Sequence, residues 1–412
     1  MALWGVSTEV LAGPELIRAI NKRRVLRLIR AAGPLSRADA AEQTNLTRPT
    51  ISAVVAELID QGWVEEMGTG ESSGGRPPIL LRFNPRARWV VGAELGAGHV
   101  RAVLADLRGE VVHRVKYRVQ SSDPFTEIAR VQNAIEELVA GRPSPEPVAG
   151  VGLGITGVVD RKTGLWRYSP HFDVSDLPAA SLLQERLGLP VWLENDARAM
   201  AWGERSFGVA RGVDNLVYIR VGVGIGAGIV IRGELYGGAH EGAGEFGHWL
   251  MKEHGPRCRC GRDGCLEAVA SATAIARAAR ERIQAGEQSL IPDLVGLAGG
   301  DLDGLMGSTV IEAGAKGDRL AQEILAEAGR YLGYAIGNLI NLLNPSMVIV
   351  GGGVSRAGGL LMTPLSEAAK ARTLPALKER VQLILSPSGE DSCPLGGAAL
   401  VIEELFRVPS MG

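Results

Sequence analysis

The side chains best suited to chemistry lie in one short stretch, where three of the four cysteines fall within eight positions. They are Cys258, Cys260 and Cys265, and His248 precedes the first of them by ten residues. Three thiolates and one imidazole can close a tetrahedral zinc site, and the two glycines between the last two cysteines allow a tight turn. Because four protein ligands leave no open coordination position, the zinc ion would be structural and not catalytic.

Two other interpretations of the cysteine cluster are open. The cysteines could be unrelated buried thiols beside a core histidine, or two of them could form a disulfide. Cys258 and Cys260 are too close in sequence to pair comfortably, and an odd number leaves one thiol over. Glu245 and Glu267 flank the cluster, and a loop fixed by a metal would hold both carboxylates rigidly. Rigid acceptors suit a ligand with many hydroxyl groups.

Charge is distributed unevenly along the chain. Residues 1–88 carry twelve basic and nine acidic side chains, a net charge of +3, whereas the whole chain of 412 residues has −2. A basic head on an acidic body indicates a nucleic-acid-binding module attached to a domain with another purpose. The length predicts two or three domains. With no signal peptide and no long apolar span, we expect a cytoplasmic protein without membrane contact, where thiolates stay reduced.

The head has the pattern of a helix-turn-helix. We expect helices over about 14–32, over 38–43 after the N-cap Ser36, and from the N-cap Thr47 onward. The apolar residues of the third helix have the spacing of one amphipathic face: Ile51, Val54, Val55, Leu58 and Ile59. Two short helices joined by a three-residue turn are typical of this DNA-binding motif.

The predicted DNA-binding side chains lie at the start of the third helix and in a following loop. Small and basic groups that point away from the apolar face can reach base edges in the major groove: Arg48, Pro49, Thr50 and Ser52. Beyond residue 62, a strand, a loop rich in glycine and proline, and a strand over 79–83 predict a wing, which suits Arg76 to the minor groove. Alternatively, Arg76 is a solvated loop residue, and the head is a protein-interaction module.

The remainder predicts a duplicated α/β fold. Two sets of three short strands share an Arg-Gly-Glu turn, at 108–110 and again at 232–234. Helical and strand patterns follow each set, so we expect two similar lobes with a cleft between them. The strands are expected over 90–95, 100–106 and 110–115, and over 216–221, 226–231 and 234–236.

A winged helix-turn-helix, Glu-x-Gly-His at 245–248 and the cysteine motif ending at Glu267 together resemble the ROK family of repressors, open reading frames and sugar kinases. The resemblance spans nearly the whole chain and favours the branch of xylose, glucose and N-acetylglucosamine repressors, because the kinases usually lack a DNA-binding head. It implies a two-lobed, actin-like (ribonuclease-H-like) fold. The expected domains are the head over 1–82, a first lobe over 83–205, and a second lobe with the zinc loop over 206–412, whose last helix could return to the first lobe.

The same resemblance implies sugar contacts at six positions: Gly157, Asn195, Asp196, Glu245, His248 and Glu267. His248 would be shared with the metal. Without the resemblance, Asn195 and Asp196 would be interpreted as a strand-end turn or a helix cap. In the family's kinases the aspartate at the position of Asp196 is the general base, so Asp196 would be catalytic only if this chain were a kinase.

The phosphate-binding turns differ from those of the kinases. Glu94 stands where a kinase has a shorter aspartate, and the turn 222–224 (Gly-Val-Gly) lacks the kinase hydroxyl. We therefore favour a repressor that binds an inverted-repeat operator as a homodimer or homotetramer and is released by a monosaccharide such as xylose or glucose. The alternatives are an ATP-dependent sugar kinase with an added DNA-binding head and a regulator that answers to a protein partner. We expect the loop over 166–171 to help select the sugar, and Cys393 to be an inert core thiol.

Overall fold

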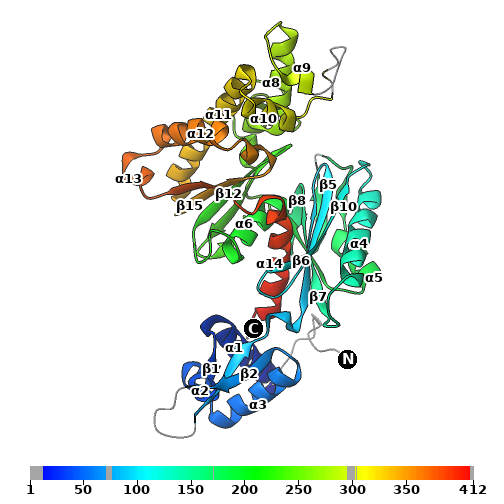
Figure 1. The fold of residues 1–412 in the computed structure, drawn as a ribbon, viewed down its shortest axis with the longest axis vertical. Coiled ribbons are helices and arrows are strands. Elements are labelled where there is room, and N and C mark those ends of the chain that lie inside the picture. The colour runs from blue at the N-terminus through cyan, green and yellow to red at the C-terminus, as the bar shows by residue number, and fades with distance from the viewer. Residues whose placement is uncertain (1–12, 71–76, 170, 295–301, 303, 409–412) are drawn as a thin grey trace.

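The chain forms a small helical head and two lobes, each built on one sheet (Figure 1). The computed structural model describes residues 13–70, 77–169, 171–294, 302 and 304–408. In Figure 1 the head lies at the bottom, and the second lobe lies at the top. This arrangement confirms the predicted mixed α/β class with a winged head. No helix of the described ranges is long and apolar enough to cross a bilayer.

Side-chain caps begin α2 (Arg37–Thr44) and α3 (Arg48–Asp60) of the head, whereas α1 (Pro14–Ala32) begins at a proline and has no side-chain cap hydrogen bond. The Ser36 hydroxyl accepts the Asp39 N–H, and the Asp39 carboxylate accepts the Ser36 N–H, so both ends of a capping box are made. Asn45 ends α2 in the left-handed conformation at φ 55°, and the Thr47 hydroxyl caps α3. The predicted helix-turn-helix is confirmed.

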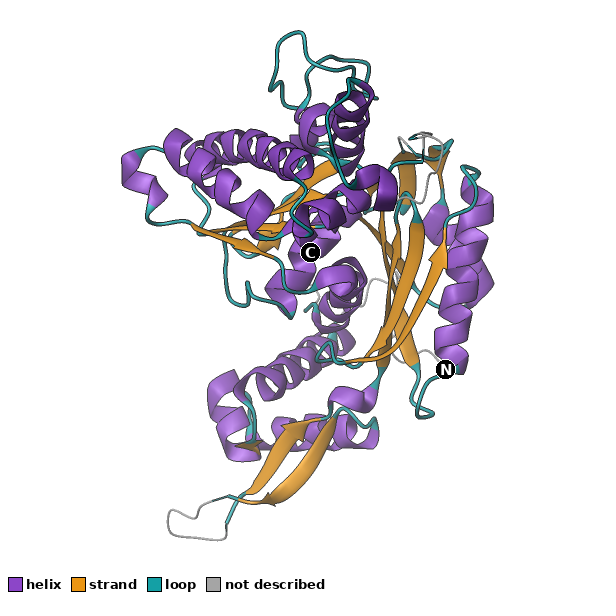
Figure 2. Ribbon diagram, turned by 45° about the horizontal axis from the view of Figure 1, so that its top comes forward, coloured by secondary structure: helices purple, strands orange, loops and turns teal. Residues whose placement is uncertain are grey.

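The wing is a three-stranded sheet beside these helices (Figure 2). Its strands are β1 (Leu35–Ser36), β2 (Val64–Thr69) and β3 (Ile79–Phe83), in the order β1-β3-β2. The loop that joins β2 to β3 contains residues 71–76, which lie outside the described residues, so the prediction for Arg76 is untested. A 3-10 helix (Pro85–Ala87) leads from the wing into the first lobe.

The two lobes have sheets of one topology. The first sheet contains β4 (Trp89–Leu95), β5 (His99–Ala105), β6 (Val111–Arg118), β7 (Val148–Ile155) and β11 (Val191–Asn195). The second contains β12 (Leu216–Val221), β13 (Ile225–Ile231), β14 (Glu234–Leu235), β15 (Met347–Gly351) and β16 (Gln382–Leu385). Each sheet runs from three antiparallel strands to two parallel ones, in the orders β6-β5-β4-β7-β11 and β14-β13-β12-β15-β16. The faint repeat in the sequence is therefore a real duplication.

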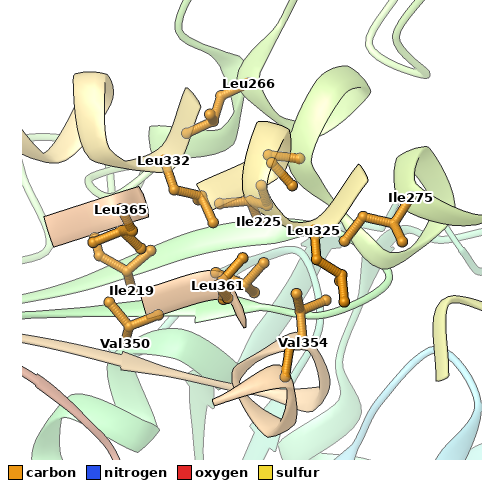
Figure 3. Close-up of a cluster of buried hydrophobic side chains, with 14 of the residues drawn as sticks. Ile219, Ile225, Leu266, Ile275, Leu325, Leu332, Val350, Val354, Leu361 and Leu365 are labelled. Carbon is orange, nitrogen blue, oxygen red and sulfur yellow. The ribbon is translucent and has the colours of Figure 1, made fainter. Parts of the chain in front are cut away.

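Helices cover both sheets. The first lobe carries α4 (Pro124–Ala140), α5 (Ala179–Leu187) and α6 (Asp196–Ser206). The second carries α7 (Leu266–Ala270), α8 (Ala272–Gln284), α9 (Ile291–Leu294), α10 (Gly307–Ala315), α11 (Arg319–Leu343), α12 (Gly359–Arg372) and α13 (Pro375–Lys378). Its core joins Ile219 and Val350 of the sheet to Leu332 of α11 and Leu361 of α12 (Figure 3). Helix α6 also packs against β12 and β13, so it lies between the lobes.

The last helix, α14 (Ser392–Phe406), packs on the first sheet although it follows the second sheet in the chain (Figure 1). A Cβ on Gly152 would lie 2.0 Å from the Gly397 carbonyl oxygen, so the backbones of β7 and α14 are in direct contact. The far end of α14 completes the core of the head, where the Phe406 ring packs edge-on against Trp63 and Phe83. One helix thus joins the first lobe to the head.

A small sheet that the sequence did not predict lies between β7 and α5. Its strands are β8 (Val158–Asp160), β9 (Leu165–Tyr168) and β10 (Ser175–Leu177). Trp166 was expected in a sugar-selecting loop, but its indole is fully buried and donates to the Thr156 carbonyl at 3.0 Å. That part of the prediction is wrong, because the alternation of β9 turns Trp166 into the core.

Candidate ligand site, metal cluster and nucleic-acid interface

Four candidate metal ligands converge in the second lobe. One ligand atom from each of His248, Cys258, Cys260 and Cys265 lies within 4.8 Å of all the others. The Cys260 and Cys265 sulfurs are 3.7 Å apart, and the Cys258 sulfur is 3.7 Å from His248 Nδ1. Tetrahedral zinc with Zn–S bonds of ~2.3 Å requires sulfurs ~3.8 Å apart and a sulfur-to-nitrogen distance of ~3.6 Å. The donor set and its spacing therefore fit a tetrahedral ion, and the disulfide alternative is not supported, since all the cysteines are free.

The loop that carries these cysteines turns through two left-handed glycines. Gly261 has φ 86° and Gly264 has φ 70°, and a Cβ on Gly264 would lie 1.7 Å from the Lys252 carbonyl oxygen. A side chain at 264 would therefore push the loop away from the segment that follows His248. Burial works against ionisation of Cys260, but hydrogen bonds from Arg262 outweigh it and lower its pKa to about 6. A thiolate of this kind is ready to bind a metal near neutral pH.

His248 faces two partners with its two ring nitrogens. Nδ1 points to the Cys258 sulfur, while Nε2 lies 3.6 Å from Glu245 Oε2. If Nδ1 binds the metal, Nε2 carries the proton and can donate to Glu245 or to a ligand. One imidazole can therefore serve the metal and the neighbouring site at once.

Asn195 is both a helix cap and a candidate ligand contact. Its Oδ1 accepts the Ala197 and Arg198 N–H groups at the start of α6, and its Nδ2 donates to the Gly157 carbonyl at 2.9 Å. One amide hydrogen is left for a ligand. Gly157 has φ 108°, and a Cβ there would lie 2.1 Å from the Tyr168 carbonyl, so the turn requires glycine whether or not it touches a ligand.

Asp196 holds an acceptor without a donor. Its side chain is buried; Oδ1 accepts the Ala197 N–H at 2.7 Å, whereas Oδ2 has no hydrogen-bond partner. Arg220 Nη1 stands 3.4 Å from Oδ2, a charge contact that is long for a hydrogen bond. Burial raises the pKa of Asp196, which Arg220 opposes and Glu94 reinforces. A buried carboxylate oxygen without a donor is the feature expected where a ligand hydroxyl binds.

Two further carboxylates belong to the same region. Glu267 Oε2 accepts the Ile225 N–H at 3.0 Å, which fixes the side chain beside the turn at 222–224. Burial raises the pKa of Glu245, and the charges of Glu267 and Asp196 raise it further, although His248 opposes them. We call Asn195, Asp196, Glu245, His248 and Glu267 the interlobe site.

The turn after β4, where the resemblance to the kinases implied a phosphate site, carries internal ion pairs. Glu94 is buried, and its Oε2 lies 3.1 Å from His99 Nε2 and 3.2 Å from Arg101 Nη1. Burial works to raise the pKa of Glu94, but the His99 hydrogen bond and the nearby arginines lower it overall. Arg101 also contacts Glu390 at 3.0 Å. The sequence analysis missed these pairs, and it missed Arg220, although an arginine inside the apolar strand β12 was a visible sign.

A set of ion pairs links the start of α6 to the segment that precedes Glu245. Glu194 is fully buried and binds Arg198 Nε at 2.6 Å and Arg161 Nε at 3.1 Å. Arg198 Nη1 then reaches Glu241 Oε2 at 3.0 Å, on the segment that leads to Glu245. Sequence reasoning did not find this set of ion pairs, because Arg161 and Glu241 meet Glu194 and Arg198 only in the folded state.

Arg259 reaches from the cysteine loop to the small sheet. Its Nη1 lies 2.9 Å from His171 Nδ1, just after β9. Burial lowers the pKa of His171 to about 4, with help from Arg259 and Arg220. A neutral imidazole can accept the hydrogen bond of Arg259. A groove of about 480 Å³ lies elsewhere, beside β11 and α14, and contains no member of the interlobe site.

The start of α3 presents several exposed side chains. Arg48, Pro49 and Ser52 are exposed as predicted, whereas Thr50 is half-buried and bonded to the Thr47 cap. The sequence analysis missed Ala53 and Ala56, which extend the exposed surface along the helix. Small residues let the helix approach bases closely and contact thymine methyl groups.

Comparisons with known proteins agree with this architecture. The ROK family model matches residues 90–404, and the MarR family model matches residues 20–73. A xylose repressor of Caldicellulosiruptor bescii is 31% identical over 396 residues, which cover 96% of this chain and 98% of the relative. The N-acetylglucosamine repressor of Escherichia coli O157:H7 is 30% identical over 389 residues, which cover 94% of this chain and 93% of that one.

Solved structures of ROK family proteins are also similar to this chain. A ROK family transcriptional regulator, a homolog of the Escherichia coli Mlc protein, superposes with a TM-score of 0.81 at 33% identity and covers 95% of this chain and 97% of its own. A ROK family glucokinase from Streptomyces griseus, in complex with glucose and AMPPNP, has a TM-score of 0.69 at 31% identity and covers 76% of this chain and 98% of its own.

Proposed function

The chain belongs to the ROK family, and from this premise we propose that it is a transcriptional repressor that a monosaccharide releases from its operator. The carrying observation is Asp196 Oδ2, a buried acceptor without a hydrogen-bond donor beside two further carboxylates. Relatives with a head of the same kind are xylose and N-acetylglucosamine repressors. The chain is a regulator and not an enzyme.

The proposed sugar contacts are the interlobe site together with Gly157. Asp196, Glu245 and Glu267 would accept sugar hydroxyls, Asn195 would donate its remaining amide hydrogen, and His248 would donate from Nε2. On binding, the polar groups of the sugar would exchange hydrogen bonds to water for hydrogen bonds to these protein groups. A sugar of the xylose or glucose class fits this donor and acceptor set.

The proposed metal is one structural zinc ion bound by His248, Cys258, Cys260 and Cys265. Their sulfur and nitrogen donor atoms support zinc over the harder cations, which prefer oxygen ligands. The ion would hold the loop and thereby orient Glu245 and Glu267 for the sugar. The ion would not act as a Lewis acid toward a ligand, because its four coordination positions are all taken by protein atoms.

The proposed DNA-binding residues are Arg48, Pro49, Thr50 and Ser52 in the major groove and Arg76 in the minor groove. Arg48 and Ser52 are exposed at the helix start, where major-groove contacts are usual. A single head covers too little surface to select one genomic site, so we propose a homodimer or homotetramer on an inverted repeat. We place the boundaries of head and lobes near residues 82 and 205, and the protein in the cytoplasm.

Two connections would carry the sugar signal to the head. Binding would draw the lobes together, and the short link from Asn84 to Arg88 has little slack to absorb such a movement. Helix α14 is the second connection, because it begins beside Glu94 and Asp196 and ends in the core of the head. The spacing of two heads would change, and two half-sites could no longer be bound together.

The test is operator affinity by fluorescence anisotropy, with and without each of a panel of aldoses. A coupling free energy of ~1–3 kcal/mol would weaken operator binding by about 5- to 150-fold. Linkage requires operator DNA to weaken sugar binding by the same factor. If every sugar that binds leaves operator affinity unchanged or increases it, release by a sugar is the wrong mechanism.

A further inference from the structure

Arg220 is a buried arginine to which the proposed function gives no role. It lies in β12, whose other residues are apolar apart from Tyr218, and its side chain is only 12% exposed. A buried guanidinium is costly unless a negative charge compensates it. The groups around this side chain therefore indicate what it does.

The second sheet leaves room for the Arg220 side chain beside α6. Arg220 pairs with Gly226 of β13 and with Gly351 of β15, so neither neighbouring strand carries a side chain on that face. A Cβ added to Gly226 would lie 3.4 Å from the Ala197 side chain, so this face packs on the first turn of α6. The guanidinium thus reaches across from the second lobe to Asp196, with Nη1 3.4 Å from Oδ2.

No second cation contacts the Asp196 carboxylate within the described part of the chain. Arg220 is the one basic side chain there that forms an ion pair with it, and the charge of Arg220 acts on Asp196 more strongly than that of His99 does. The other cations of the region are held by other carboxylates: His99 and Arg101 by Glu94, and Arg198 by Glu194 and Glu241.

The remaining titratable groups around Asp196 do not replace Arg220. Glu94 faces Asp196 from β4, and Glu245 faces it from the segment beside the metal cluster. Both are carboxyls, so their charges oppose the ionisation of Asp196. Cys393 of α14 is buried, which raises the pKa of its thiol well above the ordinary value and keeps the thiol neutral.

We propose that Arg220 is a positioning residue of the interlobe site, which keeps Asp196 ionised and holds its carboxylate so that Oδ2 can accept a hydrogen bond from a ligand. The inference rests on the proposed function, because it assigns a residue that acts on the same site. The contact of 3.4 Å stabilises the charge but is long for a hydrogen bond, so Oδ2 stays free to accept one. Without Arg220, burial and the charge of Glu94 would act without a cation in contact to oppose them, and Asp196 would keep its proton to higher pH.

The experiment follows sugar binding by the full chain across pH. The probes are glucose, xylose and N-acetylglucosamine, and titration calorimetry measures their affinity between about pH 5 and pH 9. Affinity should fall as the pH drops through the pKa of Asp196, because the protonated carboxyl loses an acceptor. In Arg220→Met the midpoint of that fall should lie about one to three pH units higher than in the unaltered chain, the usual effect of an arginine in contact with a carboxylate.

Further variants separate the charge of Arg220 from its packing. Arg220→Lys keeps the positive charge and should bring the midpoint back toward that of the unaltered chain. Adding Asp196→Asn to Arg220→Met removes the titrating group, so the residual binding should no longer fall at the shifted midpoint. Arg220→Gln takes the place of Arg220→Met if the methionine variant fails to fold.

Arg277→Met is the matched control. Arg277 is a half-buried arginine of the same lobe that donates to the Ala268 carbonyl, and its loss should leave the midpoint as it is. Glu245 and the candidate metal ligands titrate in all of these proteins alike. The difference in midpoint between variants, and not the profile of any one protein, is therefore the result that decides.

The outcomes separate this inference from the proposed function. A midpoint that moves by less than about half a pH unit in Arg220→Met, or that moves equally in Arg220→Lys, overturns the inference and leaves the sugar-responsive repressor standing. A shifted fall that persists after Asp196→Asn also overturns it, because Arg220 would then act on another group. If none of the three sugars binds at any pH, the proposed function itself fails, and the inference fails with it.

Discussion

Replacing Phe406 with alanine tests whether α14 connects the sugar to the head. The ring is buried, its centroid lies 6.1 Å from that of Trp63 and 5.8 Å from that of Phe83, and the Arg30 guanidinium lies 4.4 Å above it. Truncating a buried phenylalanine to alanine costs ~3–5 kcal/mol. This exceeds the ~1–3 kcal/mol expected for coupling between sites. A head that has lost this much packing against α14 should no longer move with that helix when the sugar binds.

The expected result is a loss of response and not a loss of DNA binding. Operator affinity should fall by no more than about tenfold in Phe406→Ala, because α3 is untouched, while the sugar should no longer change it by more than about twofold. Fluorescence anisotropy measures both quantities, and hydrogen exchange of the head amides checks that the head has loosened. Phe406→Leu is the matched control, since it keeps most of the apolar volume and should cost under ~1.5 kcal/mol.

If Phe406→Ala releases the operator at the same sugar concentration and by the same factor as the unaltered chain, α14 does not carry the signal. The link from Asn84 to Arg88 would then be the remaining connection. A parallel loss of sugar binding would instead show that the substitution reaches the interlobe site.

Five other outcomes are expected. Cys260→Ser should lower bound zinc from one ion per chain, measured by elemental analysis, and should weaken sugar binding because the loop loses its anchor. Asp196→Asn should weaken sugar binding at least about tenfold in calorimetry while operator affinity stays the same. Because burial raises the pKa of Asp196, the folded state holds a proton on this carboxyl at pH values where the unfolded state has lost it. Stability should therefore fall as pH rises from the ordinary aspartate pKa through the raised one. Asp196→Asn removes this ionisation and should raise Tm at neutral pH. Arg48→Ala should weaken operator binding and reduce its salt dependence, and Arg76→Ala should weaken it most at A·T-rich flanks.

Local signals in the sequence were sufficient for the head. The caps Ser36 and Thr47 act within four residues of a helix start, and α1 begins at a proline and is followed by Gly33, so no distant contact is needed to predict these bounds. The antiparallel strands of both sheets also followed from short-range patterns, because strands joined by tight turns pair with their neighbours in sequence.

The interlobe site was only partly predictable. Asn195 had two interpretations in the sequence, a helix cap or a ligand contact, and its side chain caps α6 while keeping one hydrogen for a ligand. The contacts of Arg220 with Asp196 and of Arg198 with Glu241 join elements distant in sequence, and a single sequence carries no signal of such contacts. The segment over 166–171 was mistaken for a loop, because the small sheet that buries Trp166 forms only after the chain returns as β10.

Helix α14 imposes an order on the synthesis of this protein. The head is the first of the described parts to leave the ribosome, yet part of its core comes from a helix translated after both lobes. Until that helix emerges, the indole of Trp63 and the ring of Phe83 lack their cover, and exposed aromatic surface invites association with other chains. The head can therefore pack stably against the lobes only after both sheets have been translated.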